Sequence, residues 1–194
     1  MIIIGAGAGG TALAARLAKR GYTVKVFEKN DFNGGRCSLI HHNGHRFDQG
    51  PSLYLMPKVF EDTFKDLGEN IHDHIELLRC PKNYTLHFHD GQKCELSTDI
   101  NQLCREVEKF EGHDGGQTVF RLLKFIQESH QHYELSLKFA LQRNYPRLSD
   151  LLKPGHLPLV FRLHILEKIY DRVKTYFKSD HMRKAFTFQT MYIG

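Results

Sequence analysis

The first 28 residues constrain the fold more than any other stretch of the chain. Met1–Ile4 is a short apolar run that suits a buried strand, and it leads directly into the glycine-rich segment Gly5–Gly10. Thr11–Arg20 has helical composition, and Tyr22–Phe27 alternates like a second strand that ends at Glu28. The order strand, glycine loop, helix, strand, acid predicts the start of a doubly wound α/β domain.

The glycines of this loop have the spacing G-x-G-x-x-G, in which each position has a physical role. Gly5 permits the tight turn after the strand, Gly7 lets a pyrophosphate approach the backbone, and Gly10 lets the helix pack against the strand. The helix N-terminus offers free N–H groups to the phosphates, and Glu28 is placed to accept hydrogen bonds from a ribose. These features predict dinucleotide binding, and the acid argues against NADP, whose extra phosphate it would repel.

A second glycine pair follows the acid after a short polar loop. Gly34 and Gly35 allow the backbone to lie against a ligand, and Arg36 beside them can reach a phosphate. The alternative is an ordinary turn, but the position shortly after Glu28 favours cofactor contact. The predicted cofactor-binding residues are Gly5, Ala6, Gly7, Ala8, Gly9, Gly10, Glu28, Lys29, Gly34, Gly35 and Arg36.

The rest of the chain changes from strands to helices. We expect a Rossmann-like part over residues 1–74 and a substrate domain part over residues 75–194, helical from about residue 99. Asn43-Gly44 signals a hairpin turn, and Asp48–Ser52 is expected to form a loop. The expected strands are 37–40, 45–47, 75–78, 84–88 and 93–96, and the expected helices are 57–67, 99–110, 117–142 and 157–177.

Positive charge is concentrated in the helical part. The net charge is +5, and residues 118–194 contain 13 Lys and Arg but only 6 Asp and Glu. Nucleic acid is not expected as a partner because no recognisable motif accompanies the charge. The basic face on the expected helix 157–177 is most simply the solvated face of a core helix. The alternatives are that the helix lies on an anionic membrane surface or closes over an apolar ligand. That face carries Arg162, Lys168, Arg172, Lys174 and Lys178.

Cysteine and histidine spacing predicts no metal site. The four cysteines show no C-x-x-C pair, so a reduced, intracellular compartment is expected. The clustered histidines lack acidic or cysteine partners at motif spacing. The histidines considered were His41, His42, His45, His72, His74, His87 and His89.

Taken together, these segments resemble the phytoene desaturases of the bacterial and fungal type, and the fungal enzymes most. The resemblance extends over the whole chain. It rests on the glycine loop with Glu28, on Asn30–Ser38, on Phe47–Ser52 and on Ala185–Tyr192. Amine oxidases often have arginine two residues before the glycine pair, where this chain has Phe32, which favours a desaturase-like site.

The resemblance implies an FAD enzyme of the amine-oxidase-like superfamily that removes hydrogen from phytoene and from partly desaturated carotenes. It also implies peripheral membrane association, and a homo-oligomer is one expected state. Family members are far longer, so this chain is expected to be an N-terminal part without turnover of its own. The catalytic base stays unidentified, with Asp48 and His45 near the cofactor motifs in sequence only.

Alternative functions share the same motifs. A carotenoid isomerase, a ketolase or a retinol saturase would carry the same FAD-binding residues. A non-catalytic binding module could keep the fold without the flavin, although Glu28 and the intact glycines speak against it. An NAD dehydrogenase gives no reason for Gly34-Gly35-Arg36. The number of desaturation steps and the electron acceptor are not predicted.

Overall fold

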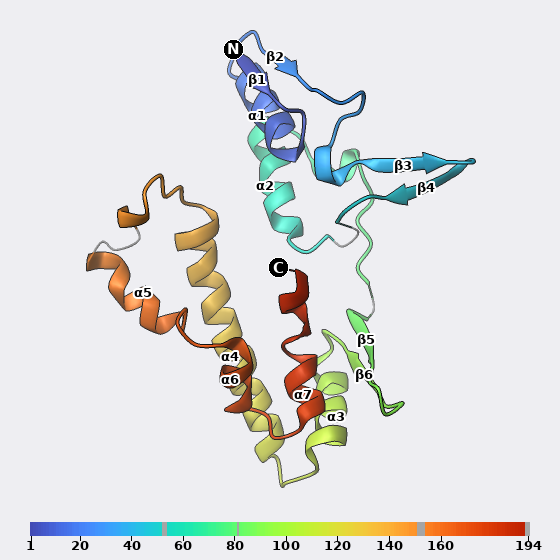
Figure 1. Ribbon diagram of the computed structural model, residues 1–194, viewed down its shortest axis with the longest axis vertical. Coiled ribbons are helices and arrows are strands. Elements are labelled where there is room, and N and C mark those ends of the chain that lie inside the picture. Colours follow the sequence, from blue (N-terminus) through green and yellow to red (C-terminus); the bar gives the residue numbers. More distant parts are fainter. Residues whose placement is uncertain (52–53, 81, 151–153, 193–194) are drawn as a thin grey trace. The chain divides into compact units, whose positions relative to one another are not determined.

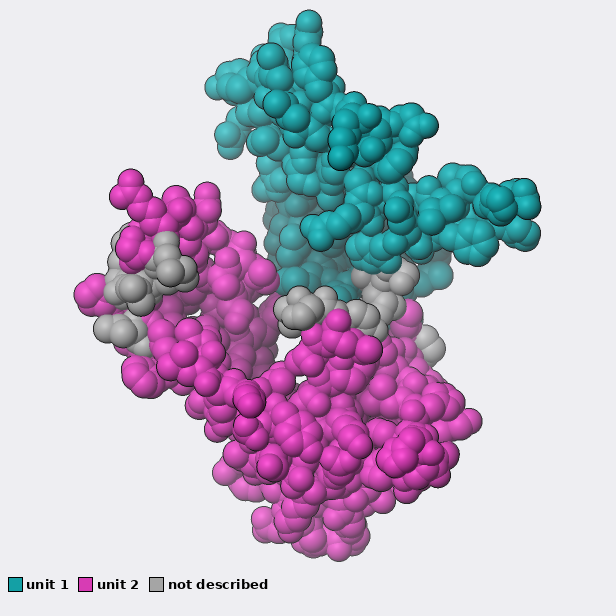
Figure 2. Space-filling model, in the orientation of Figure 1, with its two compact units in different colours: residues 1–79 teal, residues 80–194 magenta. Residues whose placement is uncertain are grey.

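The computed structural model describes residues 1–51, 54–80, 82–150 and 154–192 (Figure 1). The chain divides into two compact units, residues 1–79 and residues 80–194 (Figure 2). The sequence analysis placed the boundary between residues 74 and 75. The assignment of one part to the cofactor and the other to the substrate stays a prediction.

The first unit begins with the strand–helix–strand arrangement that the glycine motif predicts. Strand β1 (Ile2–Ile4) pairs in parallel with β2 (Lys25–Phe27), and helix α1 (Ala8–Lys19) connects them. Ile3 and Ala6 are buried, whereas the other residues of β1 are exposed. The second strand begins at Lys25 instead of Tyr22 because only three residues pair with the short β1. The Rossmann-like start is therefore confirmed.

A hairpin follows where the Asn-Gly signal predicts one. Strands β3 (Leu39–His42) and β4 (His45–Asp48) are antiparallel. Asn43 and Gly44 both have positive φ angles, of 48° and 77°. A two-residue type I′ turn requires such angles, and its twist matches that of the two strands it connects. Of the expected loop after this hairpin, Ser52 lies outside the described residues.

Helix α2 (Pro57–Leu67) has the predicted bounds. Pro57 occupies the first turn, where its missing N–H costs no hydrogen bond, and Gly68 ends the helix with a φ of 80°. Two side chains of α1 hold α2: Arg16 Nη2 lies 3.3 Å from Asp66 Oδ2, and Lys19 Nζ donates to the Asp66 carbonyl at 2.8 Å. These contacts fix α2 against the helix that follows the glycine loop.

The second unit combines one hairpin with helices. Strand β5 (Tyr84–His87) pairs with β6 (Lys93–Leu96) in an antiparallel hairpin. Helix α3 (Ile100–Glu111) begins at Asp99, whose carboxylate accepts hydrogen bonds from the N–H groups of Asn101 and Gln102. The remaining helices are α4 (Gln117–Ser136), α5 (Leu157–Arg162), α6 (Ile169–Lys174) and α7 (Asp180–Ala185).

The core of this unit joins the hairpin to four of the helices. Phe177 is almost completely buried and stacks on Phe186, with ring centroids 4.7 Å apart. The buried members of the core are Cys94, Leu96, Val107, Leu122, Val173, Phe177, Met182 and Ala185. Burial of these side chains supplies the apolar area that holds the hairpin and helices together.

The strand expected over residues 37–40 forms at Leu39–His42 instead, because Cys37 belongs to a 3-10 turn. Three further expected elements differ in the structure. No strand forms over residues 75–78, because these residues have no partner strand among the described residues and Leu78 is exposed. The expected helix 117–142 leaves α geometry after Ser136 and continues as a π-helical turn over Leu137–Leu141. The expected helix 157–177 is two short helices, because His164 between them has a φ of 50°, which no α-helix contains. None of the helices in the described part of the chain has the length and apolarity to cross a bilayer.

Candidate functional site

The glycine loop joins β1 to α1 through a turn that needs glycine at its first position. Gly5 has a φ of 101°, a conformation that side chains disfavour, and its N–H donates to the Phe27 carbonyl at 2.7 Å. Gly7 is the residue before α1 and has extended backbone, with φ −72° and ψ 179°. The turn therefore connects the end of β1 directly to the start of α1.

Gly10 is the point of closest packing in this loop. A Cβ atom at Gly10 would lie 2.0 Å from the Gly5 carbonyl oxygen, far inside any permitted contact. A Cβ atom at Gly7 or Gly9 would meet no protein atom within 4 Å. Gly10 thus has a structural role, whereas the absence of a side chain at Gly7 leaves open space next to the backbone.

The N-terminus of α1 has the properties of an anion-binding site. None of the side chains that the structure describes caps it, and its first turn contains no acidic residue. The first N–H groups of a helix lack partners within the helix and carry partial positive charge. A pyrophosphate would satisfy these groups, and the open space at Gly7 gives it room. The loop therefore fits the phosphates of a dinucleotide.

Glu28 reaches the glycine loop from the end of β2. Its Oε2 accepts a hydrogen bond from the Ala6 N–H at 2.7 Å, and its Oε1 accepts from the backbone and side chain of Asn30 at 3.0 and 2.8 Å. The N–H groups of Ala6 and Asn30 hold the pKa of the Glu28 carboxyl below its usual range. The carboxylate is ionised next to the loop, as ribose binding requires, and its contact with a ribose stays a prediction.

The second glycine pair lies against the first glycine loop. The Gly34 N–H donates to the Ala6 carbonyl at 2.9 Å, and Gly34 pairs with Gly7 in an isolated parallel bridge. Gly35 has a φ of 59°, and a Cβ atom there would lie 3.3 Å from the Gly7 Cα. Two motifs that are well separated in sequence therefore form one backbone surface.

The charged residues near this surface are less constrained. Arg36 follows Gly35 in a 3-10 turn that spans Gly35–Cys37, and its side chain is exposed. Lys29, Ala8 and Gly9 are exposed as well. The structure places Arg36 next to the joined glycine segments, but its contact with a phosphate, and that of Lys29, remain predictions.

Residues 3–67, which contain this surface, match the family model described as "NAD(P)-binding Rossmann-like domain". The whole chain is 56% identical over 194 residues to the phytoene desaturase of Phycomyces blakesleeanus, of which it covers 33%. The chain is similar to fungal phytoene desaturases over its whole length. It is also 50% identical over 196 residues to the phytoene desaturase of Neurospora crassa, again over 100% of this chain and 32% of the relative.

The similarity extends to bacterial desaturases. The "zeta-carotene-forming phytoene desaturase" of Myxococcus xanthus is 39% identical over 194 residues, which are 100% of this chain and 37% of that protein. The chain spans about a third of the length of the curated relatives it matches.

The residues that support the second glycine pair were not predicted from the sequence. A Cβ atom at Gly50 would lie 2.1 Å from the Arg36 carbonyl oxygen, so the chain passes very close to the turn that carries Arg36. The Ser38 hydroxyl donates to the Gln49 side-chain oxygen, and the Gln49 N–H donates to the Ser38 carbonyl at 3.1 Å. The sequence indicated only a loop here, because the contacts join segments on either side of a hairpin.

Proposed function

We propose that this chain forms part of the FAD-binding site of a phytoene desaturase. The rest of that site would come from a segment corresponding to the additional length of its relatives. The observation that carries the proposal is the joined backbone surface of Gly7 and Gly34–Gly35 at the uncapped start of α1. Similarity to fungal phytoene desaturases over the whole chain supports the same function.

FAD is the cofactor that this surface suits best. An acid at the ribose position disfavours NADP, and the second glycine pair with Arg36 supplies a further phosphate contact that an NAD enzyme would not need. Bound FAD supplies a hydride acceptor for the oxidation of a carbon–carbon single bond. In this assignment Gly7 and the N–H groups of α1 hold the pyrophosphate, and Glu28 exchanges its bond with Ala6 for the ribose hydroxyls.

The proposed substrates are phytoene and partly desaturated carotenes. Each step removes a hydride from an allylic carbon and a proton from the neighbouring carbon, so that one double bond is added to the conjugated series. A C40 hydrocarbon offers no polar group to bind, and the protein must position it by apolar contacts and keep water away from the flavin. Asp48 and His45 lie exposed on β4, and neither is assigned as the base.

Peripheral membrane association forms part of the proposal, because such a substrate resides in the bilayer. Four large apolar side chains from the end of α5 to the start of α6 are each more than half exposed. They are Phe161, Ile165, Leu166 and Ile169. Arg162, Lys168 and Lys174 accompany them, which favours an anionic lipid surface. Arg172, expected on the same basic face, instead pairs with Glu128.

The experiment that tests the function is an absorption spectrum of the purified complete protein, followed by anaerobic addition of phytoene in liposomes. The proposal expects flavin bands that bleach while a longer-wavelength polyene spectrum grows. Flavin bands that do not bleach would support the isomerase or ketolase alternatives. A protein without flavin would contradict the enzyme assignment and leave a binding module that shares the fold.

Membrane association is tested separately by flotation with liposomes of neutral or anionic lipid. Binding should be stronger to anionic liposomes and should weaken when Phe161 and Leu166 are both replaced by Ser. A matched control is Leu141→Ser, since Leu141 is also a strongly exposed apolar residue of the second unit. Equal loss in the control and the double variant would contradict the proposed surface.

A further inference from the structure

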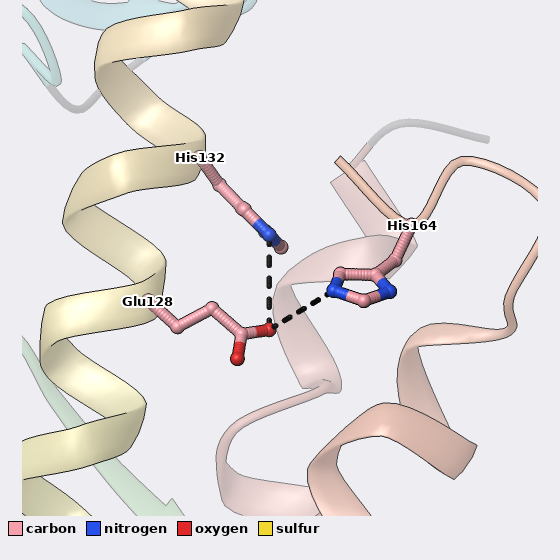
Figure 3. A group of neighbouring side chains, drawn as sticks. All are labelled: Glu128, His132 and His164. Atoms are coloured by element: carbon pink, nitrogen blue, oxygen red, sulfur yellow. Dashed lines mark ion pairs between the residues drawn. The ribbon is translucent and has the colours of Figure 1, made fainter. Parts of the chain in front are cut away.

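Three potential metal ligands converge in the second unit. Glu128 and His132 are one helical turn apart on α4, so they share a face, and His164 approaches from the turn between α5 and α6 (Figure 3). Glu128 Oε1 lies 3.7 Å from His132 Nε2 and 4.0 Å from His164 Nε2. All three candidate atoms lie within 4.8 Å of one another.

His132 has a buried nitrogen that the protein leaves unsatisfied. Its Nε2 has no hydrogen-bond partner among the described residues, although the atom is shielded from solvent. Buried polar atoms without partners are rare because the lost hydration is not replaced. The contact of this nitrogen with Glu128, at 3.7 Å, is too long for a hydrogen bond. A ligand between the two groups would satisfy both.

The His164 ring lies between two carboxylates, with one ring nitrogen near each of them. Its Nδ1 lies 3.4 Å from the Glu167 carboxylate, and its Nε2 faces Glu128 (Figure 3). In metal-binding histidines, the ring nitrogen that does not bind the metal usually donates its N–H to a carboxylate, which leaves the other nitrogen unprotonated for the metal. The backbone of His164 also has a φ of 50°, and such strained residues occur preferentially at functional sites.

Glu128 is held in place by hydrogen bonds from Arg172 and Tyr176. Arg172 donates through Nε to Oε1 at 2.6 Å and through Nη2 to Oε2, and the Tyr176 hydroxyl also donates to Oε2. Each carboxylate oxygen can accept two hydrogen bonds, so Oε1 keeps one lone pair toward the histidines.

We propose that Glu128, His132 and His164 bind a divalent cation of the zinc type. Two imidazoles and one carboxylate form a donor set found in three-ligand zinc sites, which keep a fourth position for water or another ligand. Metal–ligand bonds of about 2.0–2.2 Å place tetrahedral ligand atoms about 3.3–3.6 Å apart. The ligand atoms in this chain need to approach by no more than about 1.5 Å, given their limit of 4.8 Å.

The fourth position has room in the adjoining pocket. Glu128, His132 and His164 all line a pocket of about 740 Å³, so a metal bound by them would face a space that admits water. The site contains none of the histidines that the sequence analysis considered. The proposal is also independent of the flavin function, since its residues all lie outside the Rossmann-like unit.

The test is a zinc titration of the untagged complete protein after treatment with EDTA and dialysis, in competition with a chromophoric chelator. The variants are His132→Gln and His164→Gln. The matched control is His130→Gln, because His130 lines the same pocket from the same helix but is not one of the three ligands. We expect one bound Zn²⁺ per chain, an affinity loss of about tenfold or more in each ligand variant, and no change in the control.

Two further measurements on the wild-type protein keep the proposal testable if a ligand variant fails to fold. Added Co²⁺ should give the visible absorption of a tetrahedral site, and Zn²⁺ should raise the thermal midpoint because it binds only the folded state. The absence of both signals would show that Glu128, Arg172 and the histidines form an ion-pair network only. An equal loss of affinity in His130→Gln would also overturn the assignment.

Discussion

Replacement of Gly10 by alanine tests the link between the glycine motif and the fold most directly. The new methyl group would lie 2.0 Å from the Gly5 carbonyl oxygen and 3.1 Å from its carbonyl carbon. Both atoms belong to the backbone of the turn after β1, so no side chain can rotate to remove the clash. Helix α1 must therefore move relative to the turn by more than 1 Å to restore contacts above 3.0 Å.

The expected cost follows from two opposing effects. Forcing an extra methyl group into a closely packed position costs about 1–3 kcal/mol. Replacing glycine by alanine in a helix returns up to about 1 kcal/mol, because the unfolded chain becomes less flexible. The free energy of opening α1 should therefore fall by about 1–2 kcal/mol in Gly10→Ala, which corresponds to amide exchange that is roughly 5–30 times faster.

Hydrogen exchange read by mass spectrometry, on peptides that cover α1, measures this change locally. The matched control is Gly9→Ala, since Gly9 also lies in the first turn of α1 but its added methyl group would meet no atom within 4 Å. Exchange in the control should be unchanged or slower. Equal exchange rates in the two variants would refute the packing role of Gly10.

Three further predictions concern the cofactor loop, the core and the start of α4. Gly7→Ala should leave the thermal midpoint unchanged but weaken FAD binding by the complete protein by about tenfold or more, because its methyl group enters the space proposed for the pyrophosphate. Fluorescence titration with FAD measures the affinity. Phe177→Ala should lower the free energy of unfolding by about 3–5 kcal/mol, because Phe177 is fully buried. Phe161→Ala, at an exposed position, should change it by less than about 0.5 kcal/mol, and urea titrations measure both values. Asp114→Asn should lower the thermal midpoint most near neutral pH, because the Thr118 N–H and then Arg121 lower the pKa of the Asp114 carboxyl. Since the folded pKa lies below the unfolded one, this stabilisation is complete above about pH 4 and disappears as the pH falls through the folded pKa.

The outcomes that would contradict these predictions differ from one another. Normal FAD affinity in Gly7→Ala would show that the pyrophosphate does not bind next to Gly7. Similar destabilisation by the two phenylalanine substitutions would mean that burial does not distinguish them. A thermal difference between wild type and Asp114→Asn that stays constant down to pH 2 would show that the carboxylate charge is not responsible.

Features set by neighbouring residues were predictable from the sequence. The glycine spacing indicated the Rossmann-like start and Asn43-Gly44 the hairpin, since each acts through backbone geometry within a few residues. The sequence placed the start of α3 at Thr98 or Asp99, and the structure shows Asp99. The bounds of α2 followed from Pro57 and Gly68 in the same way. Strand pairing is different, because the sequence of a segment does not show whether a partner strand lies beside it. The strand predicted over residues 75–78 was therefore wrong.

The remaining features depend on contacts between distant parts of the chain. The i, i+4 spacing of Glu128 and His132 on a predicted helix was a signal available in the sequence, but nothing local identifies His164 as the third member. His164 reaches them only because the expected helix 157–177 breaks at its positive φ. The sequence by itself determined the local turns, caps and the nucleotide-binding loop, because these need only short-range geometry. The tertiary structure alone decided that Gly34 meets Gly7 and that two histidines face one carboxylate, because only packing brings such residues together.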